Sequence, residues 1–271
     1  MSQPGTTDST RRVAIITGAA EGIGRGIASR LAKDGLDLGL FDLPRAETRL
    51  QELAETLKKE YGTKVTTVYG DVSKEDDVKR LVETVVQEHG SLYAMIANAG
   101  VAINRVLHET PTEELDRLLN INVKGTFFSY KYAAIQLIKQ GTGGRIIGAA
   151  SIASKKGIAL HSAYCATKFA VRGLTQSAAM DYGKYGITVN AYAPGAIETP
   201  LLHGLDEYHT KLNGQPPGTW SNSFSNLLGR NGQPEDVAKL VSFLVSDDAA
   251  FITGEWYRKI AYLVDGGTCF D

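Results

Sequence analysis

The sequence predicts an α/β fold in which a parallel sheet is covered by helices on both faces, and three observations lead to this prediction. Short apolar runs rich in β-branched residues recur along the chain, as expected of strands buried on both faces. Longer segments between these runs carry apolar residues at helical spacing. Runs and segments alternate over residues 12–271 without a linker or a change in composition, which indicates a single domain.

The expected strands and helices follow one another along the chain. The runs expected to form strands are Val13–Thr17, Leu36–Phe41, Val65–Tyr69, Leu92–Ala97, Arg145–Ala150, Thr188–Ala193 and Ala261–Val264. Helical periodicity is clearest in the apolar faces formed by Ile23, Ile27, Ala28 and Leu31, by Val78, Leu81, Val82 and Val85, and by Val237, Leu240, Val241 and Leu244. Because the apolar residues recur every three or four positions, each helix is expected to pack one apolar side against the sheet.

The composition is that of an ordinary soluble globular protein, with 43% hydrophobic and 22% charged residues in a chain of 271. The formal net charge is −1 and no long run of one sign occurs, so nothing indicates nucleic acid or an anionic membrane as a partner. No apolar run approaches the roughly 18 residues that a membrane span needs. A small-molecule substrate is therefore expected.

The beginning of the chain and the cysteines bear on the cellular compartment. Residues 1–11 include Asp8 and lack an apolar core, so we expect a disordered tail and not a secretory signal. Cys165 and Cys269 match neither a disulfide framework nor a metal-binding spacing, so no metal site is expected. This cysteine usage fits a reducing compartment, and the protein is expected to be cytoplasmic.

Residues 196–230, called the lid segment below, do not fit the alternation, because they are rich in Gly, Pro, Asn and Ser. A structureless connection of this length inside a compact domain is usually functional, and we expect a lid over the substrate. Its large side chains include Leu201, Leu202, Tyr208, Trp220 and Phe224. The insertion Glu255–Lys259 also falls outside the alternation, and its role is left open.

A glycine-rich turn connects the first expected strand to the first helix. Backbone N–H groups and the positive end of a helix can bind a pyrophosphate at such a turn, because glycines let the backbone approach it closely. The flanking strand and helix supply the context that this motif requires, so a dinucleotide site is predicted. The residues of the turn assigned to this site are Gly18, Glu21, Gly22, Ile23 and Gly24.

The second expected strand leads into Asp42, where a carboxylate can accept hydrogen bonds from the ribose hydroxyls of the adenosine. Asp42 would also repel a 2′-phosphate, and Glu21 adds a second negative charge nearby. Arg45 is the one basic residue expected close enough to oppose this effect. The sequence therefore favours NAD over NADP, with Leu43 beside Asp42 in the same site.

Two further strand ends carry candidate cofactor residues. The third expected strand closes at Asp71 and Val72, and the fourth at Asn98, Ala99 and Gly100. Ligands of open α/β sheets bind at the carboxyl ends of the strands. Together with the glycine turn, these residues outline one cofactor crevice.

Tyr164 and Lys168 lie four residues apart and share one face of an expected helix. A free tyrosine titrates near pH 10, and a nearby lysine ammonium, like the positive nicotinamide ring, favours the phenolate and lowers that pKa. Ser151 follows a buried strand, from where it can hydrogen-bond the substrate oxygen that Tyr164 protonates. This set predicts acid–base catalysis at a carbonyl or an alcohol.

The motifs occur together in the order typical of one family, and from Arg12 onward the chain resembles the short-chain dehydrogenase/reductases. The matching motifs are Thr17-Gly18-x₃-Gly22-x-Gly24, Asn98-Ala99-Gly100, Asn122, Ser151, Tyr164-x₃-Lys168, Pro194-Gly195 and Asp265-Gly266-Gly267. The resemblance implies a Rossmann-type, doubly wound sheet of seven parallel strands. It also implies nicotinamide as the hydride carrier and no metal in the chemistry.

The resemblance implies roles for individual residues. Tyr164 would be the acid–base group, Ser151 would orient the carbonyl, and Lys168 would bind the nicotinamide ribose and lower the pKa of Tyr164. Asn122 would hold a water in a proton relay through Lys168. Further cofactor contacts carried over are Pro194, Gly195, the main chain of Ile197 and the hydroxyl of Thr199. Relatives are commonly tetramers built on the helices near residues 112–140 and 161–184, so a homotetramer is expected.

Within the family, the chain resembles acetoin and diacetyl reductases (butanediol dehydrogenases). The similar stretches are Lys168–Gln176, Gly186–Asn190 and Pro234–Val237. Ile152 departs from their pattern, because those enzymes tend to carry a polar side chain beside the catalytic serine. Ten residues separate Gly254 from Asp265, several more than is usual in the family. The resemblance implies an NAD-dependent dehydrogenase of a small α-hydroxyketone, diketone or vicinal diol.

The substrate side of the site leaves more alternatives. Ile152, His161 and Trp220 are expected to contact the substrate, although such a histidine is often a wall residue without proton chemistry and lid aromatics often anchor a lid to the core. His203 and His209 are expected to be solvated or to fill gaps. Competing activities are a polyol or sugar-alcohol dehydrogenase, another secondary-alcohol dehydrogenase and a reductase of carrier-bound 3-oxoacyl chains. The competing class is a non-catalytic dinucleotide-binding regulator.

Overall fold

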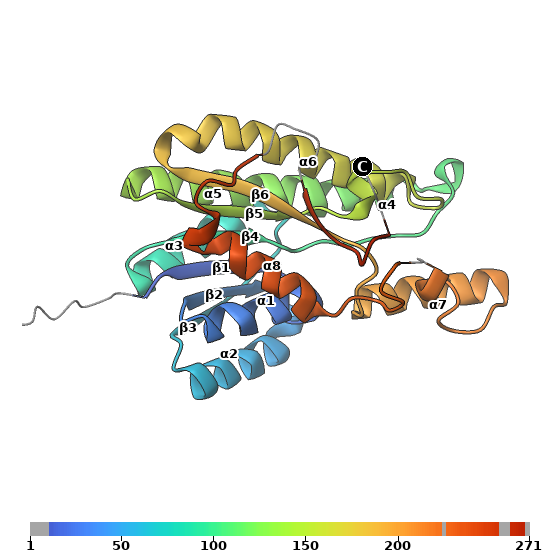
Figure 1. Cartoon of the computed structure of the whole chain (residues 1–271), viewed down its shortest axis with the longest axis horizontal. Helices are drawn as coiled ribbons and strands as arrows, with labels where there is room; N and C mark the ends of the chain where they lie inside the picture. Colours follow the sequence, from blue (N-terminus) through green and yellow to red (C-terminus); the bar gives the residue numbers. More distant parts are fainter. Residues whose placement is uncertain (1–10, 224–225, 255–260, 269–271) are drawn as a thin grey trace, which may run out of the picture.

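A computed structural model describes residues 11–223, 226–254 and 261–268. It contains a seven-stranded parallel sheet with strand order β3-β2-β1-β4-β5-β6-β7 (Figure 1). The strands are β1 (Val13–Thr17), β2 (Asp37–Asp42), β3 (Val65–Tyr69), β4 (Ala94–Ala97), β5 (Gly144–Ala149), β6 (Ile187–Pro194) and β7 (Ala261–Val264). The α-helices described are α1 (Gly22–Lys33), α2 (Glu47–Tyr61), α3 (Glu75–His89), α4 (Thr112–Leu118), α5 (Gly125–Gln140), α6 (Ser162–Tyr182), α7 (Pro200–Asn213) and α8 (Pro234–Val245).

The predicted fold class is confirmed. All residues of β1 and β6 are buried, as the near-continuous apolar runs of the sequence indicate. The observed strands differ from the expected ones by at most two residues at either end.

Helices cover the sheet on both faces, and each face has its own large hydrophobic core. Side chains of α1, α2 and α8 pack on one face, whereas those of α3, α5 and α6 pack on the other. The strand order reverses at β1, because β2 pairs with one edge of this strand and β4 with the other. Such a switch point opens a crevice at the carboxyl ends of the strands, where ligands of α/β sheets bind.

The expectation that the lid segment is structureless is wrong, because α7 occupies its first half. Thr199 caps this helix, with its hydroxyl accepting a hydrogen bond from the N–H of Leu202 at 3.3 Å. Pro200 stands at the first helical position, and Gly214 ends the helix in the left-handed conformation. These start and stop signals are present in the sequence, where the high content of Gly and Pro obscures them.

The two ends of the lid segment are joined to each other. Ile197 and Gly232 form an isolated parallel β-bridge. The N–H of Glu198 donates to the carbonyl of Gly232, and the N–H of Gly232 donates to the carbonyl of Ala196, both at 2.9 Å. The amide of Asn231 also donates to the Glu198 carboxylate at 2.7 Å. The segment therefore leaves the domain and returns to it through one narrow neck.

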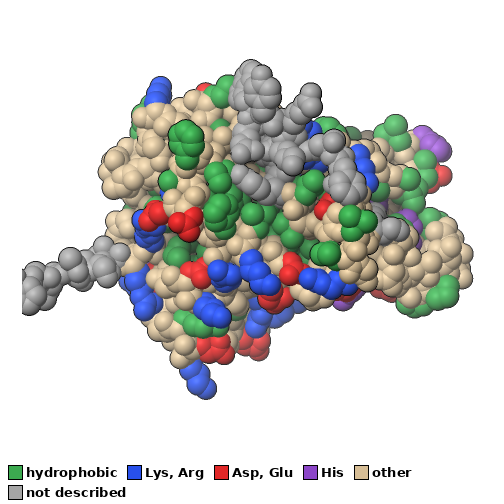
Figure 2. Space-filling view, viewed as in Figure 1, with side chains coloured by type: hydrophobic (Ala, Val, Ile, Leu, Met, Phe, Trp, Pro, Cys, Tyr) green, Lys and Arg blue, Asp and Glu red, His purple; other side chains and the backbone are tan. Residues whose placement is uncertain are grey.

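The face in view in Figure 2 shows no concentration of one charge, because Lys and Arg side chains lie among Asp and Glu side chains.

Arg11, expected to end the tail, donates a hydrogen bond to the carbonyl of Gly62 at 2.8 Å. Residues 1–10 of that tail, Phe224 and the insertion Glu255–Lys259 lie outside the described residues. None of the described helices has the length and apolar character needed to cross a membrane.

Candidate active site

A cavity of about 660 Å³ lies at the carboxyl ends of the strands. Every predicted cofactor and substrate residue lines it except Gly24, and so do three of the four predicted catalytic residues. The two exceptions, Gly24 and Asn122, are buried and support residues of the wall. The structure thus brings strand-end residues that are distant in sequence to one place.

The glycine turn approaches its neighbours too closely for side chains. Gly18 and Gly22 have positive φ angles of 65° and 55°. A Cβ on Gly24 would lie 2.0 Å from the carbonyl oxygen of Gly18, so helix and turn can pack only with glycine at this position. Among the described residues, no side chain caps the N-terminus of α1, whose first N–H groups therefore remain available to an anion.

Asn98 braces this turn with its side chain. Its amide nitrogen donates to the carbonyls of Thr17 at 2.9 Å and Gly18 at 3.1 Å. Its amide oxygen accepts a hydrogen bond from the hydroxyl of Tyr192 at 2.8 Å. Asn98 therefore fixes the shape of the pyrophosphate turn, and Tyr192 is a supporting residue that the sequence did not indicate.

Asp42 lies at the end of β2 and lines the same cavity as Tyr164. One carboxylate oxygen accepts from the N–H of Ala20 at 2.9 Å and the other from the N–H of Leu43 at 2.8 Å. These two bonds hold the carboxylate in place, and its remaining lone pairs can accept from the hydroxyls of a ribose.

The charges around Asp42 differ from the prediction in one respect. Arg45 is not the one basic residue here, because Arg49 also lines the cavity and its guanidinium lies 3.2 Å from the carboxylate of Glu21. Arg49 follows Arg45 by one helical turn, a spacing that could have revealed it. Glu21 is therefore neutralised in part, and Asp42 carries the stronger argument against a 2′-phosphate.

Asp71 and Val72 follow β3 on the same side of the cavity. The Asp71 carboxylate accepts from the N–H of Ser73 at 2.9 Å, and its own N–H donates to Asp77 at 2.9 Å. This N–H is the main cause that holds the pKa of the Asp77 carboxyl below its usual value. Val72 packs against Gly125, where an added Cβ would meet it at 2.9 Å.

Tyr164 and Lys168 project from α6, and Ser151 follows β5. The Lys168 ammonium donates to the carbonyl of Ala149 at 2.7 Å and lies 5.6 Å from the centre of the Tyr164 ring. The Ser151 hydroxyl accepts from the N–H of Ala153 at 3.1 Å and also hydrogen-bonds with Tyr164. A strand end and the following helix thus place the three groups around one point.

The pKa values at this centre differ from the expectation. Burial raises the pKa of the Tyr164 phenol to about 12, although the hydrogen bond with Ser151 acts in the lowering direction. Burial also lowers the pKa of Lys168 to about 8. The expected lowering of the tyrosine pKa is not seen, because burial of the phenol disfavours the charged phenolate.

Asn122 lies in a π-helical turn, Leu119–Lys124, just before α5. Its amide oxygen accepts from the N–H of Val101, and its amide nitrogen donates to the carbonyl of Val101, both at 2.9 Å. The same nitrogen donates to the hydroxyl of Thr167 at 3.1 Å. Asn122 therefore joins the loop after β4 to the helix that carries Tyr164 and Lys168.

Gly100 lies where these groups converge. A Cβ on Gly100 would be 3.3 Å from the amide oxygen of Asn122 and 3.5 Å from the Lys168 ammonium. The strand end, the asparagine and the lysine therefore lie close together around Gly100.

The residues predicted to meet the nicotinamide follow β6. Pro194 ends this strand, and a Cβ on Gly195 would lie 2.7 Å from the side chain of Asp265. The Thr199 hydroxyl donates to the carbonyl of Ile197 at 3.1 Å while it caps α7. The start of the lid segment is thus part of the cavity wall.

Ile152 and His161 lie near Tyr164, and Trp220 reaches the same cavity from the lid segment. Burial lowers the pKa of the His161 imidazole, whose Nδ1 lies 2.9 Å from the carbonyl of Ala159. Because a carbonyl can only accept, Nδ1 carries the hydrogen and Nε2 of the neutral ring is an acceptor. His203 is exposed and pairs with Glu198, whereas His209 is buried.

A doubly wound sheet with a glycine turn at the first strand and Ser, Tyr and Lys at the crevice defines the class of protein, an oxidoreductase on a dinucleotide-binding fold. Comparisons with known proteins agree. The profile of the family described as enoyl-(acyl carrier protein) reductase matches residues 18–268. A short-chain dehydrogenase/reductase from Armillaria gallica is 44% identical over 268 residues, covering 98% of this chain and 99% of the relative.

Two further relatives have more specific names. A diacetyl reductase ((S)-acetoin forming) from Staphylococcus epidermidis is 44% identical over 264 residues, covering 96% of this chain and 99% of the relative. The crystal structure of an acetoin dehydrogenase from Salmonella typhimurium has a TM-score of 0.81 at 31% identity, covering 95% of this chain and 96% of that one. The chain belongs to the short-chain dehydrogenase/reductase family.

The predicted family is thereby confirmed. Members of this family generally use NAD(P). The protein is an oxidoreductase that interconverts carbonyl compounds and secondary alcohols.

Proposed function

We propose that the protein is an NAD(H)-dependent enzyme that interconverts a small vicinal diketone or α-hydroxyketone and the corresponding alcohol. The observation that carries this proposal is the single cavity that runs from Asp42 to the Ser151, Tyr164 and Lys168 group. Diacetyl reductase and acetoin dehydrogenase are the names of relatives that match nearly the whole chain. These names support the substrate class.

The residues of the cavity fit a nicotinamide dinucleotide. The turn between Gly18 and Gly24 exposes helix N–H groups to a pyrophosphate, and Asp42 has acceptor capacity for a ribose. A bound NADH would supply the hydride. The Asp42 carboxylate, which is fixed by two backbone N–H groups, supports NAD over NADP, because a 2′-phosphate beside it would meet a like charge.

At the reacting centre, Tyr164 donates its hydroxyl proton to the substrate oxygen and Ser151 donates a hydrogen bond to the same oxygen. The high pKa of Tyr164 keeps the phenol protonated for carbonyl reduction at neutral pH. Lys168 supplies positive charge behind the tyrosine, and a bound nicotinamide in its oxidised form would add to that charge. Asn122 holds the loop after β4 beside α6 and is proposed to hold a water that delivers protons to Lys168.

We also propose that the enzyme is a homotetramer. Apolar side chains on α5 and α6 are exposed, with exposed fractions of 48% for Phe127, 53% for Ile135, 44% for Phe169 and 60% for Met180. Such side chains are typical of an interface when they gather on one face. Light scattering on the wild type and on Met180→Glu tests this point, and a monomeric wild type would contradict it.

The enzymatic proposal is tested by following the absorbance of NADH and NADPH with a panel of carbonyl compounds. The panel contains diacetyl, acetoin, a ketose, a 3-oxoacyl thioester and an aryl ketone. We expect fast oxidation of NADH with diacetyl or acetoin and little with NADPH. A preference for NADPH would show that Arg45 and Arg49 outweigh Asp42. Turnover confined to the ketose or the aryl ketone would contradict the substrate assignment and leave the mechanism in place.

A further inference from the structure

The lid segment meets the catalytic helix through three aromatic rings, His161, Trp220 and His209, called the aromatic stack below. The indole of Trp220 is parallel to the imidazole of His161, with ring centres 5.7 Å apart and planes 3° apart. It is also stacked with the imidazole of His209, at 4.4 Å and 11°. These separations lie in the range of favourable aromatic contacts.

The loop that carries Trp220 is fixed to α7 by a buried carboxylate. Asp206 accepts hydrogen bonds from the N–H of Gly218 at 2.6 Å and from the N–H of Ser221 at 2.9 Å. Asp206 precedes His209 by one helical turn, so the same face of α7 holds both the backbone and the ring of Trp220. The indole therefore has a defined position within the lid segment.

The position of the His161 ring is also fixed, by the backbone before it and by a hydrogen bond. Leu160, directly before it, has a φ of 65°, in the left-handed region that non-glycine residues rarely adopt. The carbonyl of Leu160 accepts from the N–H of Arg105 at 2.8 Å, and the His161 ring is hydrogen-bonded to Ala159. The fold maintains a strained backbone conformation at the residue that positions this imidazole.

The same loop that holds Leu160 also holds α7. The Arg105 guanidinium donates to the hydroxyl of Tyr208 at 2.7 Å, and the Asn104 amide donates to the carbonyl of Leu205 at 3.2 Å. The loop after β4 thus connects both partners of Trp220. The two segments that contact the indole are therefore held by one loop.

The aromatic stack begins beside the reacting centre. The His161 ring lies 6.0 Å from the Tyr164 ring in an edge-on arrangement, and His161 and Trp220 both line the cavity. His209 is 4% exposed and supports Trp220 from within the lid segment. Because the same cavity must also accommodate a dinucleotide, the position of the indole limits the room left beside Tyr164.

We propose that Trp220 is the specificity-determining residue of this enzyme, that it restricts the substrate to compact aliphatic diketones and hydroxyketones, and that His209 is the positioning residue that holds it. This inference rests on the proposed function and adds the residue that sets the size limit. Removing the indole enlarges the substrate end of the cavity, and removing the His209 ring lets the indole move without changing any group that faces the substrate.

The test compares two vicinal diketones that differ in size, diacetyl and 1-phenyl-1,2-propanedione, with NADH as the reductant. Wild-type enzyme is expected to prefer diacetyl. In Trp220→Ala, the ratio of kcat/KM for the phenyl diketone to kcat/KM for diacetyl is expected to rise about tenfold or more, since pocket contacts discriminate at this level. Trp220→Phe, which keeps an aromatic ring, is expected to change the ratio less and guards against a folding defect in the alanine variant.

The positioning role of His209 has its own controls on the same helix. His209→Ala is expected to raise KM for diacetyl roughly threefold to tenfold with little change in kcat, and His209→Phe is expected to restore KM, because it restores the stacked ring. His203→Ala removes an exposed imidazole from α7 and is expected to leave both constants unchanged. An equal loss in His203→Ala and His209→Ala would contradict the positioning role.

The outcomes separate the two proposals. If Trp220→Ala and Trp220→Phe turn over diacetyl with an unchanged size ratio, Trp220 does not set the specificity and the inference is overturned while the proposed function stands. If wild-type enzyme turns over the phenyl diketone faster than diacetyl, the size limit itself is wrong. If the wild type turns over neither diketone nor acetoin but binds NADH, measured by fluorescence, the proposed function fails and the inference fails with it.

Discussion

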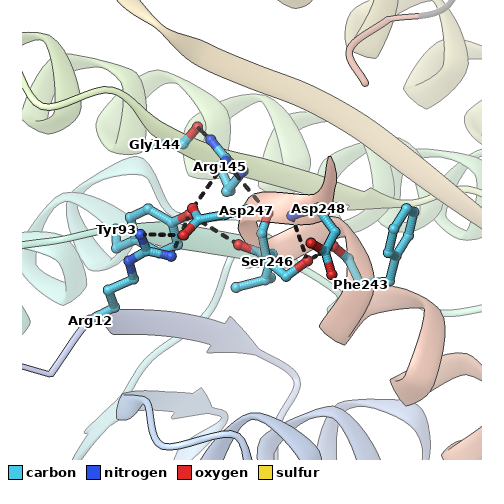
Figure 3. A network of polar contacts seen from close by, with 9 residues as sticks. Arg12, Tyr93, Gly144, Arg145, Phe243, Ser246, Asp247 and Asp248 are labelled. Atoms are coloured by element: carbon cyan, nitrogen blue, oxygen red, sulfur yellow. Dashed lines mark hydrogen bonds and ion pairs between the residues drawn. The ribbon is translucent and has the colours of Figure 1, made fainter. Parts of the chain in front are cut away.

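Strands β1, β4 and β5 have charged and polar residues at both of their ends, and the two ends use them differently. At the amino ends, Arg12 precedes β1, Tyr93 precedes β4 and Arg145 lies in β5 (Figure 3). Arg12 lies 2.9 Å and Arg145 3.8 Å from the carboxylate of Asp247, and Arg12 also donates to the Tyr93 hydroxyl. A groove of about 530 Å³ adjoins this network.

At the carboxyl ends of the same strands, the groups are buried beside a cavity and their pKa values are displaced. Burial lowers the pKa of Lys168 to about 8. At the amino ends, by contrast, the hydrogen bond from Arg12 lowers the pKa of the Asp247 carboxyl. The exposed Arg12–Asp247 pair contributes little to stability, whereas a buried ammonium with a displaced pKa beside a tyrosine and a cavity is suited to proton transfer. The two ends of the sheet thus both adjoin hollows of similar size, and the ionisable groups inside them distinguish the candidate active site from the groove.

The largest effect is expected from Tyr164→Phe, which removes one oxygen at the carboxyl ends. Turnover is expected to fall by roughly three orders of magnitude or more, because the proton donor is lost, while NADH binding persists. Steady-state kinetics and fluorescence titration measure the two quantities. Tyr182→Phe, on the same helix, is the matched control. Normal turnover in Tyr164→Phe would contradict the proposed mechanism and favour a regulator that only binds the dinucleotide.

The next effect concerns the cofactor end of the cavity. Asp42→Ala is expected to shift the ratio of kcat/KM for NADH to kcat/KM for NADPH toward NADPH by roughly tenfold to a hundredfold, because hydrogen bonds to a charged group are lost along with a repulsion. Asp42→Asn keeps an acceptor and is expected to shift it less. Glu52→Ala, an exposed position on α2, serves as the control. An unchanged ratio in Asp42→Ala would assign cofactor choice to Arg45 and Arg49.

The pH dependence follows from Lys168. Burial lowers the pKa of this lysine from 10.5 to about 8, so kcat/KM for carbonyl reduction is expected to fall about tenfold per pH unit above pH 8, as the ammonium loses its proton. Stability shows the opposite sign. Between pH 8 and 10.5 the unfolded chain binds more protons at Lys168 than the folded one, so wild type gains stability relative to Lys168→Met as the pH rises. A pH-independent difference between the two would refute the displaced pKa.

The smallest effect on activity is expected at the amino ends. Arg145→Ala is expected to lower the free energy of unfolding by about 2 kcal/mol, because a buried guanidinium that donates to the carbonyl of Gly144 is removed. Its kcat/KM is expected to equal that of the wild type. Urea denaturation measures the free energy of unfolding, and steady-state kinetics on the same preparation measure kcat/KM. If Arg145→Ala lost activity without losing stability, the amino ends of the strands would also contribute to catalysis, and the contrast with the carboxyl ends would be wrong.

Much of the fold could be predicted because its signals are local. Strands buried on both faces are near-continuous apolar runs, and β1, β3 and β7 begin and end where the sequence indicates. The helix α7 is harder to predict, because the segment that contains it is rich in Gly and Pro, although Thr199-Pro200 and Gly214 mark its two ends.

The candidate site likewise has residues that the sequence predicts and contacts that only tertiary packing determines. Gly18, Asp42, Ser151, Tyr164 and Lys168 could be found because chemistry requires particular residue types at strand ends. Spacing does not show that Arg49 pairs with Glu21, because that contact depends on how α2 packs beside the glycine turn. The stacking of His209 on Trp220 is likewise fixed by tertiary packing. The spacing of Tyr164 and Lys168 does not show how deeply the phenol is buried, and this burial raises its pKa.

The narrow neck at Ile197 and Gly232 has a consequence for how this scaffold can diverge. A loop whose ends are already joined can be lengthened, shortened or replaced with little cost to the rest of the domain, since each doubling of loop length costs only about 0.6 kcal/mol in closure entropy. The segment is also attached inside the neck, because Asn104 and Arg105 hydrogen-bond to α7 and Trp220 contacts His161. Insertions are therefore tolerated best between these attachments, in the exposed residues 214–217 that follow α7.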